Sequence, residues 1–140
     1  KIPMIFITRR ERFNAAHRLF HPDFDDKTNL EVFGKCSNPN WHGHNYELFV
    51  TVKGEINPKT GFLINLTSLK ELIRRKITDK LDHKNLNVEV DFLLGKFTST
   101  EVLCVSIWEQ LEAEIEQMGA QLHCVKITET ENNFVEYYGN

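Results

Sequence analysis

The sequence has few of the features that mark membrane proteins and disulfide-rich secreted proteins. No run approaches the ~20 consecutive apolar residues of a transmembrane helix, so we expect no membrane partner. The three cysteines, Cys36, Cys104 and Cys124, are odd in number and irregularly spaced. This argues against a disulfide framework and for a reducing compartment. Residues 1–7 are a poor match to a signal peptide, and we therefore expect a cytoplasmic location.

The chain also has no marked excess of either charge. Its formal net charge of −3 indicates neither a basic arm for nucleic acid nor a disordered acidic tail, so we expect no nucleic-acid partner. With 140 residues, 41% of them hydrophobic, it can bury a substantial core, and we expect one domain over residues 1–140. Six histidines are the compositional exception, and they direct attention to metal binding and proton transfer.

Alternation of apolar and polar residues predicts four strands. Two lie near residues 5–17 and 42–52, the first with a break in phase at Arg9 and Arg10. The other two lie near residues 122–130 and 134–138. Sequential strands joined by short connections pair antiparallel, which predicts a four-stranded antiparallel sheet.

Helical spacing predicts two helices between the second and third strands. One follows a capping box at Ser68 and Glu71 and runs to residue 81. The other follows a capping box at Thr98 and Glu101 and stops at Gly119. Residues 21–41, rich in turn formers, predict a loop. The order ββααββ is typical of an α+β domain with both helices on one face of the sheet.

The segment His42-Gly43-His44 is the first chemical signal. In a strand, residues i and i+2 point to one face, roughly 6.6–7 Å apart along the backbone, so two imidazoles can converge on one ion. Three nitrogen ligands and one open position are typical of catalytic zinc. The third ligand must come from elsewhere. His17 is the first candidate, because it lies in phase on a neighbouring strand, and His21 is the second.

Cys36, six positions before His42, has three interpretations. It could be a fourth zinc ligand, which would close the site and make it structural. It could be a reactive thiolate near the ion and Lys35. It could also be an inert buried thiol, the interpretation that we adopt for Cys104 and Cys124.

Two acidic residues add weaker signals. Asp82 precedes His83 at the end of a predicted helix, where a carboxylate could orient an imidazole for proton transfer. Glu129 shares strand parity with the apolar face around Val125 and Ile127. An inward carboxylate requires a partner, either an arginine or a ligand that donates hydrogen bonds, unless it reaches solvent at the strand end.

Together these segments resemble the 6-pyruvoyl-tetrahydropterin synthase family. The resemblance covers nearly the whole chain, and its specificity comes from five motifs in the right order. The motifs are residues 13–19 (FNAAHRL), 32–46 (VFGKCSNPNWHGHNY), 81–86 (LDHKNL), 99–101 (STE) and 129–133 (ETENN).

The resemblance implies the tunnelling fold, in which ββααββ subunits share strands around a barrel. It also implies a homohexamer of two stacked trimers, with each site at a subunit interface. The implied zinc ligands are His17, His42 and His44, and the implied proton-abstracting residue is Cys36. The implied relay consists of Asp82 and His83 from a neighbouring subunit. The implied pterin anchor is Glu129, and the residues implied to line the pterin pocket are Thr100 and Glu101.

The implied activity is that of a lyase of tetrahydrobiopterin biosynthesis. It converts 7,8-dihydroneopterin triphosphate to 6-pyruvoyl-tetrahydropterin and triphosphate, through loss of triphosphate and an internal redox rearrangement. The substrate is a small pterin triphosphate that could carry Mg²⁺. Its triphosphate requires cations, for which the candidates are Lys35, Arg18, Arg9, Arg10 and Arg12.

Two alternatives remain. The 6-carboxy-tetrahydropterin synthases of queuosine biosynthesis resemble this sequence, but their cysteine is typically closer to the histidine pair. Here five residues, 37–41, separate Cys36 from His42, which favours the pyruvoyl type. Trp41 stands where that type often has a small residue, so the pocket mouth is expected to differ. The second alternative is a non-catalytic, zinc-stabilised binding module, which gives no role to Asp82, His83 or Glu129.

Overall fold

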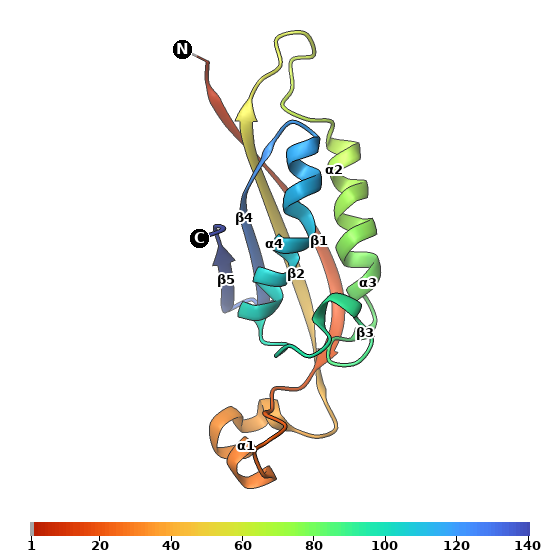
Figure 1. The fold of residues 1–140 in the computed structure, drawn as a ribbon, viewed down its shortest axis with the longest axis vertical. Coiled ribbons are helices and arrows are strands. Elements are labelled where there is room, and N and C mark those ends of the chain that lie inside the picture. The colour runs from red at the N-terminus through yellow and green to blue at the C-terminus, as the bar shows by residue number, and fades with distance from the viewer. Residues whose placement is uncertain (1) are drawn as a thin grey trace.

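Two long antiparallel strands form the centre of the computed structural model, which describes residues 2–140 (Figure 1). The strands are β1 (Met4–His17), β2 (His42–Glu55), β3 (Lys84–Asn85), β4 (Gln121–Thr130) and β5 (Asn133–Tyr137). The helices are α1 (Asp26–Phe33), α2 (Leu66–Ile73), α3 (Asp79–Leu81) and α4 (Thr100–Gln117). Short 3₁₀ turns occupy Gly34–Ser37 and Asp91–Leu93, and a π-helical turn occupies Arg74–Thr78 between α2 and α3.

The sheet has the strand order β3-β1-β2-β4-β5. The four longer strands pair antiparallel, and their order along the chain agrees with the prediction. The prediction of only four strands was wrong, because the sheet has a fifth. This two-residue strand, β3, pairs parallel with Ala15 and Ala16 at the edge of β1. That pair is too short to leave a periodic signal in the sequence.

Helices α2 to α4 cover one face of this sheet, while α1 lies beyond the sheet end at which β1 finishes and β2 begins (Figure 1). The core lies between the sheet and the covering helices. Removing these side chains from water stabilises the layer by about 25 cal/mol per Å² of buried apolar surface. Fully buried members include Leu48, Val50, Leu69, Ile73, Leu103, Ile107 and Leu111.

The helix boundaries differ slightly from those predicted. The side chain of Asn65 caps α2 by accepting a hydrogen bond from the Ser68 N–H, so the helix begins before Ser68. Ser99, rather than Thr98, caps α4 through the Val102 N–H. In both cases the N-cap is a different side chain that can also accept a hydrogen bond, Asn65 for α2 and Ser99 for α4.

The predicted loop over residues 21–41 contains a helix and a 3₁₀ turn, which corrects the prediction. The buried side chain of Asn29 in α1 accepts a hydrogen bond from the His21 N–H at 2.8 Å. Its amide also reaches the carbonyls of His21 and Phe24, each at 3.3 Å. Contacts between polar groups, rather than an apolar stripe, therefore hold this helix against its own loop.

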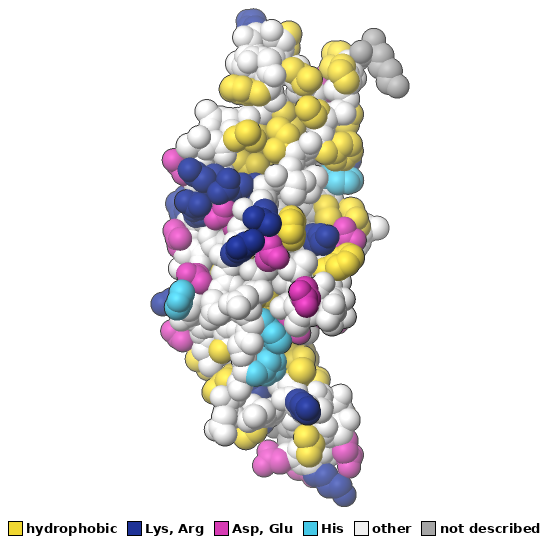
Figure 2. Space-filling model, turned by 180° about the vertical axis from the view of Figure 1, so that it is seen from behind, with side chains coloured by type: hydrophobic (Ala, Val, Ile, Leu, Met, Phe, Trp, Pro, Cys, Tyr) yellow, Lys and Arg dark blue, Asp and Glu magenta, His cyan; other side chains and the backbone are white. Residues whose placement is uncertain are grey.

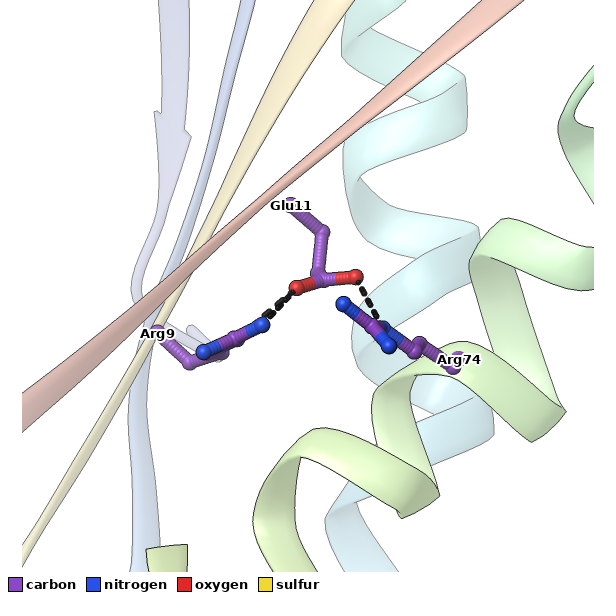
Figure 3. A network of polar contacts seen from close by, with 3 residues as sticks. All are labelled: Arg9, Glu11 and Arg74. Atoms are coloured by element: carbon purple, nitrogen blue, oxygen red, sulfur yellow. Dashed lines mark hydrogen bonds and ion pairs between the residues drawn. The ribbon is translucent and has the colours of Figure 1, made fainter. Parts of the chain in front are cut away.

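The predicted break in phase in β1 is absent, and the inner parity runs continuously from Ile5 to His17. Charged residues instead occupy two inner positions. Glu11 is only 8% exposed, and its two carboxylate oxygens accept hydrogen bonds from the Nε groups of Arg9 and Arg74, both at 2.8 Å (Figure 3). Burial raises the pKa of Glu11, but these two guanidinium groups outweigh it and leave the pKa below its usual value.

The other face of the sheet is not covered by helices. On that side hydrophobic side chains gather towards the end at which β1 begins (Figure 2). Large exposed side chains on β1 and β5 include Met4, Phe6 and Phe134. Among residues 2–140, no helix is long and apolar enough to cross a bilayer.

Candidate metal centre and active site

Three histidines converge at the sheet end next to α1. In the register of β1 and β2, His17 pairs with His42 and Ala15 pairs with His44, so all three side chains share the inner face. One nitrogen from each imidazole lies within 4.8 Å of the others, which is close enough for all three to bind one metal ion. The structure therefore selects His17 over His21 as the third member.

The environment of these imidazoles fits a metal. Nδ1 of His17 lies 2.7 Å from the Thr98 carbonyl oxygen, and must carry the proton to donate to it. This orients the ring and leaves Nε2 with a lone pair, the arrangement found around metal-binding histidines. Nε2 of His17, both ring nitrogens of His42 and Nε2 of His44 are buried with no hydrogen-bond partner among the described residues. Such a cluster of buried ring nitrogens without partners is costly unless an ion binds the lone pairs among them.

Electrostatics keep two of the rings neutral. Burial lowers the pKa of His17, and His42 and His44 lower it further, against the opposing contact with Thr98. Burial and then His44 lower the pKa of His42. A neutral imidazole is the form that binds metals, because protonation would occupy the donating lone pair.

Glu129 lies against this triad. Its Oε1 is 3.5 Å from Nε2 of His44, and its Oε2 accepts a hydrogen bond from the hydroxyl of Thr100 at the start of α4. Thr100 is buried, whereas the Glu129 side chain remains 29% exposed. The carboxylate is therefore held by the protein and still accessible to a ligand that donates hydrogen bonds.

Cys36 lies in the 3₁₀ turn before β2, and its carbonyl accepts a hydrogen bond from the Leu19 N–H at 2.8 Å. This bond ties the turn to the chain just after His17. Burial raises the pKa of Tyr46, and the charge of Glu129 raises it further. The metal-binding group found among residues 2–140 contains the three histidines without Cys36.

Asp82 and His83 contact each other directly, although adjacent residues rarely do. Oδ2 of Asp82 lies 2.9 Å from Nδ1 of His83, whose backbone adopts a positive φ of 60°. The Asn14 N–H donates to Asp82 at 2.8 Å and lowers the pKa of that carboxyl. The His83 side chain is 82% exposed, and no hydrogen bond or ion pair in the described chain joins this pair to the triad.

The remaining candidates lie elsewhere. Glu101 is exposed, in a surface depression with Lys96 and Glu109. Of the candidate triphosphate cations, three arginines are engaged with carboxylates: Arg9 pairs with Glu11, and Arg10 and Arg12 both pair with Glu47. Arg18 and Lys35 line cavities near the triad.

Comparison with known proteins agrees with this geometry. The family model described as 6-pyruvoyl tetrahydropterin synthase matches residues 6–140. The chain belongs to this family. The Drosophila melanogaster 6-pyruvoyl tetrahydrobiopterin synthase is 45% identical over 137 residues, which is 98% of this chain and 81% of the relative. The human protein of the same name is 45% identical over 133 residues, covering 95% and 90% of the two chains.

A solved structure shares the fold. The 6-pyruvoyl tetrahydropterin synthase of Caenorhabditis elegans matches with a TM-score of 0.90 and 34% identity, covering 99% of this chain and 98% of that one. The domain therefore has the tunnelling fold predicted from the sequence, and the protein belongs to a family of enzymes. Its sheet is open at both edges within one chain, because β3 and β5 each pair on one side only.

Two further residues beside the triad were not predicted from the sequence. Thr98 holds His17 through its backbone carbonyl, which no side-chain pattern can indicate. Tyr46 is 1% exposed, stacks on Phe13 with ring centroids 4.8 Å apart, and has a hydroxyl without a hydrogen-bond partner in the described chain. The sequence could have indicated Tyr46, because it lies two positions after His44 and its side chain therefore points to the same inner face of the sheet.

Proposed function

We propose that the protein is a zinc-dependent lyase that converts 7,8-dihydroneopterin triphosphate to 6-pyruvoyl-tetrahydropterin and triphosphate. The observation that carries this proposal is the group of three histidines, with unsatisfied nitrogens, beside a carboxylate held by Thr100. The synthase names of relatives with 45% identity support the choice of substrate. The reaction needs no external reductant, since the rearrangement moves hydrogen from the side chain to the ring.

His17, His42 and His44 would hold the zinc, and the ion would supply a Lewis acid for the oxygens of the substrate side chain. The residues of the chain prepare that position. Thr98 keeps the proton of His17 on Nδ1, and the apolar surroundings keep His17 and His42 neutral. The protein thereby presents lone pairs rather than N–H groups to the ion.

Glu129 would anchor the pterin. An ionised carboxylate accepts hydrogen bonds only, and the amino group and ring N–H of a pterin form a pair of donors that matches its two oxygens. The Thr100 hydroxyl donates to Glu129, and the 3.5 Å distance between Glu129 and His44 supports an anchor beside the proposed zinc. A bound pterin would extend its side chain towards the triad.

Cys36 would remove a proton from the substrate side chain, and a neighbouring subunit would contribute Asp82 and His83 as the relay that returns one. Two observations support a shared site. The Asp82–His83 pair has no hydrogen bond or ion pair to the triad among the described residues of its own chain, and the helix-free sheet face carries exposed hydrophobic side chains. We therefore propose the homohexamer of two trimers. The resemblance to the synthases further leads us to propose that Mg²⁺ accompanies the triphosphate and that the protein is cytoplasmic.

Incubation of the metal-loaded protein with 7,8-dihydroneopterin triphosphate, followed by mass analysis of the products, tests the proposal. We expect 6-pyruvoyl-tetrahydropterin together with about one equivalent of triphosphate. A 6-carboxy-tetrahydropterin would instead assign the protein to the carboxy synthase reaction. No turnover despite a full complement of zinc would favour a zinc-stabilised binding module.

A further inference from the structure

A surface cavity of about 390 Å³ is lined in part by residues that adjoin the histidine triad in the sequence. Three of its wall residues are sequence neighbours of the metal-site residues. Arg18 follows His17, Trp41 precedes His42, and Phe97 precedes Thr98, whose carbonyl orients His17. The cavity is therefore built on the segments that carry the three histidines.

The cavity lies on the opposite side of the triad from Glu129. Thr128 of β4 pairs with Glu47 of β2, so Glu129 lies level with the Tyr46 end of the histidine pair. Trp41 precedes the other end of β2. A strand advances about 3.3 Å per residue, so residues 41 and 46 are separated by at most about 17 Å. An extended ligand anchored at Glu129 and passing over the triad would therefore reach this cavity.

The wall chemistry suits a multiply charged anion. The residues that line the cavity in the described chain include Arg18, His21 and Lys96 but no carboxylate. The Nε of Arg18 donates to the Ser37 carbonyl at 2.8 Å, and its guanidinium lies 4.2 Å from the centre of the Phe20 ring. These contacts fix the guanidinium, while its two terminal nitrogens have no hydrogen-bond partner among residues 2–140.

His21 adds a second donor. Its Nδ1 accepts a hydrogen bond from the Asp23 N–H at 3.1 Å, so its proton resides on Nε2, which is available to donate. The ring is fixed by stacking on Phe24, with centroids 4.5 Å apart. Lys96 contributes less directly, because its ammonium lies 3.3 Å from the Ser106 hydroxyl on α4.

Trp41 forms an aromatic wall at a conformational cost. Its φ of 69° lies in the left-handed region, which a bulky side chain rarely occupies. Strain of this kind persists where the surroundings impose it, and it concentrates at ligand sites. With Phe20 and Phe97, the indole gives the cavity an aromatic lining, and an apolar surrounding would strengthen hydrogen bonds from Arg18 to a charged ligand.

We propose that this cavity is the subsite for the triphosphate group of the substrate, with Arg18 and His21 as donors and Trp41 as the wall. This inference rests on the proposed function. A second cavity of about 510 Å³ is also lined by Arg18 and includes Lys35, but Asp26 lines it as well. That carboxylate would repel a polyphosphate, so we assign the triphosphate to the cavity bounded by Trp41.

Calorimetric titration of the metal-loaded protein with inorganic triphosphate tests the subsite without requiring turnover. Arg18→Gln should weaken binding about ten- to a hundredfold, the effect of losing charge-assisted hydrogen bonds. Arg75→Gln is the matched control, because Arg75 is an exposed arginine paired with Glu114 and should leave affinity unchanged. Metal content is measured before and after, so that removal of zinc by the triphosphate is detected.

A second pair of variants guards against misfolding of the Arg18 variant, which loses its bond to Ser37. His21→Leu should weaken triphosphate binding about five- to tenfold, whereas Lys35→Gln should leave it unchanged. A larger loss with Lys35→Gln than with His21→Leu would assign the anion to the other cavity and overturn the proposal. Unchanged affinity in both the Arg18 and His21 variants would also overturn it.

Kinetics separate this inference from the proposed function. Arg18→Gln should raise KM for 7,8-dihydroneopterin triphosphate but leave the affinity for 7,8-dihydroneopterin, which lacks the triphosphate, unchanged. Equal losses for both pterins would show that Arg18 does not recognise the triphosphate and would refute the inference. If the unsubstituted protein shows no turnover, the proposed function fails, and the calorimetric result alone decides whether the cavity binds triphosphate.

Discussion

Replacement of Glu11 by glutamine should destabilise the protein in a pH-dependent way. Each carboxylate oxygen accepts a hydrogen bond at 2.8 Å from an arginine Nε, and the side chain is only 8% exposed (Figure 3). A glutamine keeps one acceptor but turns its NH₂ donor towards the other guanidinium. The change therefore removes the charge and one hydrogen bond while leaving the volume of the side chain nearly the same.

The magnitude follows from the burial of each partner. A hydrogen bond to a charged group contributes about 1.5–3 kcal/mol, so two would give about 3–6 kcal/mol if both were fully buried. Arg9 and Arg74 are 36% and 49% exposed, so water solvates them once the carboxylate is lost. Screening at partly exposed sites reduces the contribution considerably. We expect Glu11→Gln to lower the free energy of unfolding by about 2 kcal/mol at pH 7.

The pH dependence has a definite sign. The pKa of Glu11 is lowered in the folded state from its ordinary value of 4.5, so the folded protein binds the Glu11 proton less tightly than the unfolded chain does. The stabilisation is therefore fully present above about pH 4.5 and is lost as the pH falls through the folded-state pKa. Since glutamine does not titrate, the difference between the wild-type and variant proteins should shrink in that acidic window.

Urea unfolding monitored by far-UV circular dichroism, at one fixed protein concentration, measures this difference at pH 7 and at several lower pH values. Glu114→Gln is the matched control, because Glu114 also accepts a hydrogen bond from an arginine, Arg75, at 2.8 Å, but is 33% exposed. It should cost about 0.5 kcal/mol or less. Equal stabilities of the wild-type and Glu11→Gln proteins at pH 7, or a difference that does not change with pH, would refute the electrostatic account.

Three further predictions concern the site. His42→Ala should abolish stoichiometric zinc, measured by elemental analysis, because two imidazoles cannot hold the ion as three do; full retention of metal would contradict the assigned ligand set. Cys36→Ala should keep the zinc and the fold but lose turnover in the product assay, and loss of metal would instead indicate a structural fourth ligand. Glu129→Gln should raise KM for the pterin about ten- to a hundredfold, with metal content unchanged. An unaltered KM would exclude Glu129 as the anchor.

Local periodicity accounts for what the sequence predicted correctly. A strand repeats every two residues, so the parity of His42, His44 and Tyr46 was readable from their positions alone. His17 was likewise placed in phase with Phe13 and Ala15, and the structure confirms all of these on the inner face. The α+β class and the element order followed from the change between strand and helical spacing.

Contacts between distant segments account for what was mispredicted. Charges at Arg9 and Arg10 suggested a break in phase. The inner parity nevertheless continues through Glu11, because Arg74, 63 positions further along the chain, neutralises its carboxylate. Helix α1 depends on the buried amide of Asn29 reaching the carbonyls of His21 and Phe24, and not on a hydrophobic stripe. These contacts depend on which residues meet in three dimensions, and no local pattern reports them.

The six histidines illustrate the same division. Their number and the spacing of His42 and His44 were sufficient to predict a metal-binding face, because side-chain direction in a strand depends only on position. The choice of His17 over His21 required strand pairing, and the orientation of its ring required the Thr98 carbonyl, 81 positions away. The sequence by itself determined which side chains could bind a metal. The tertiary structure decided which of them meet and where their protons lie, because long-range pairing and backbone hydrogen bonds have no local signature.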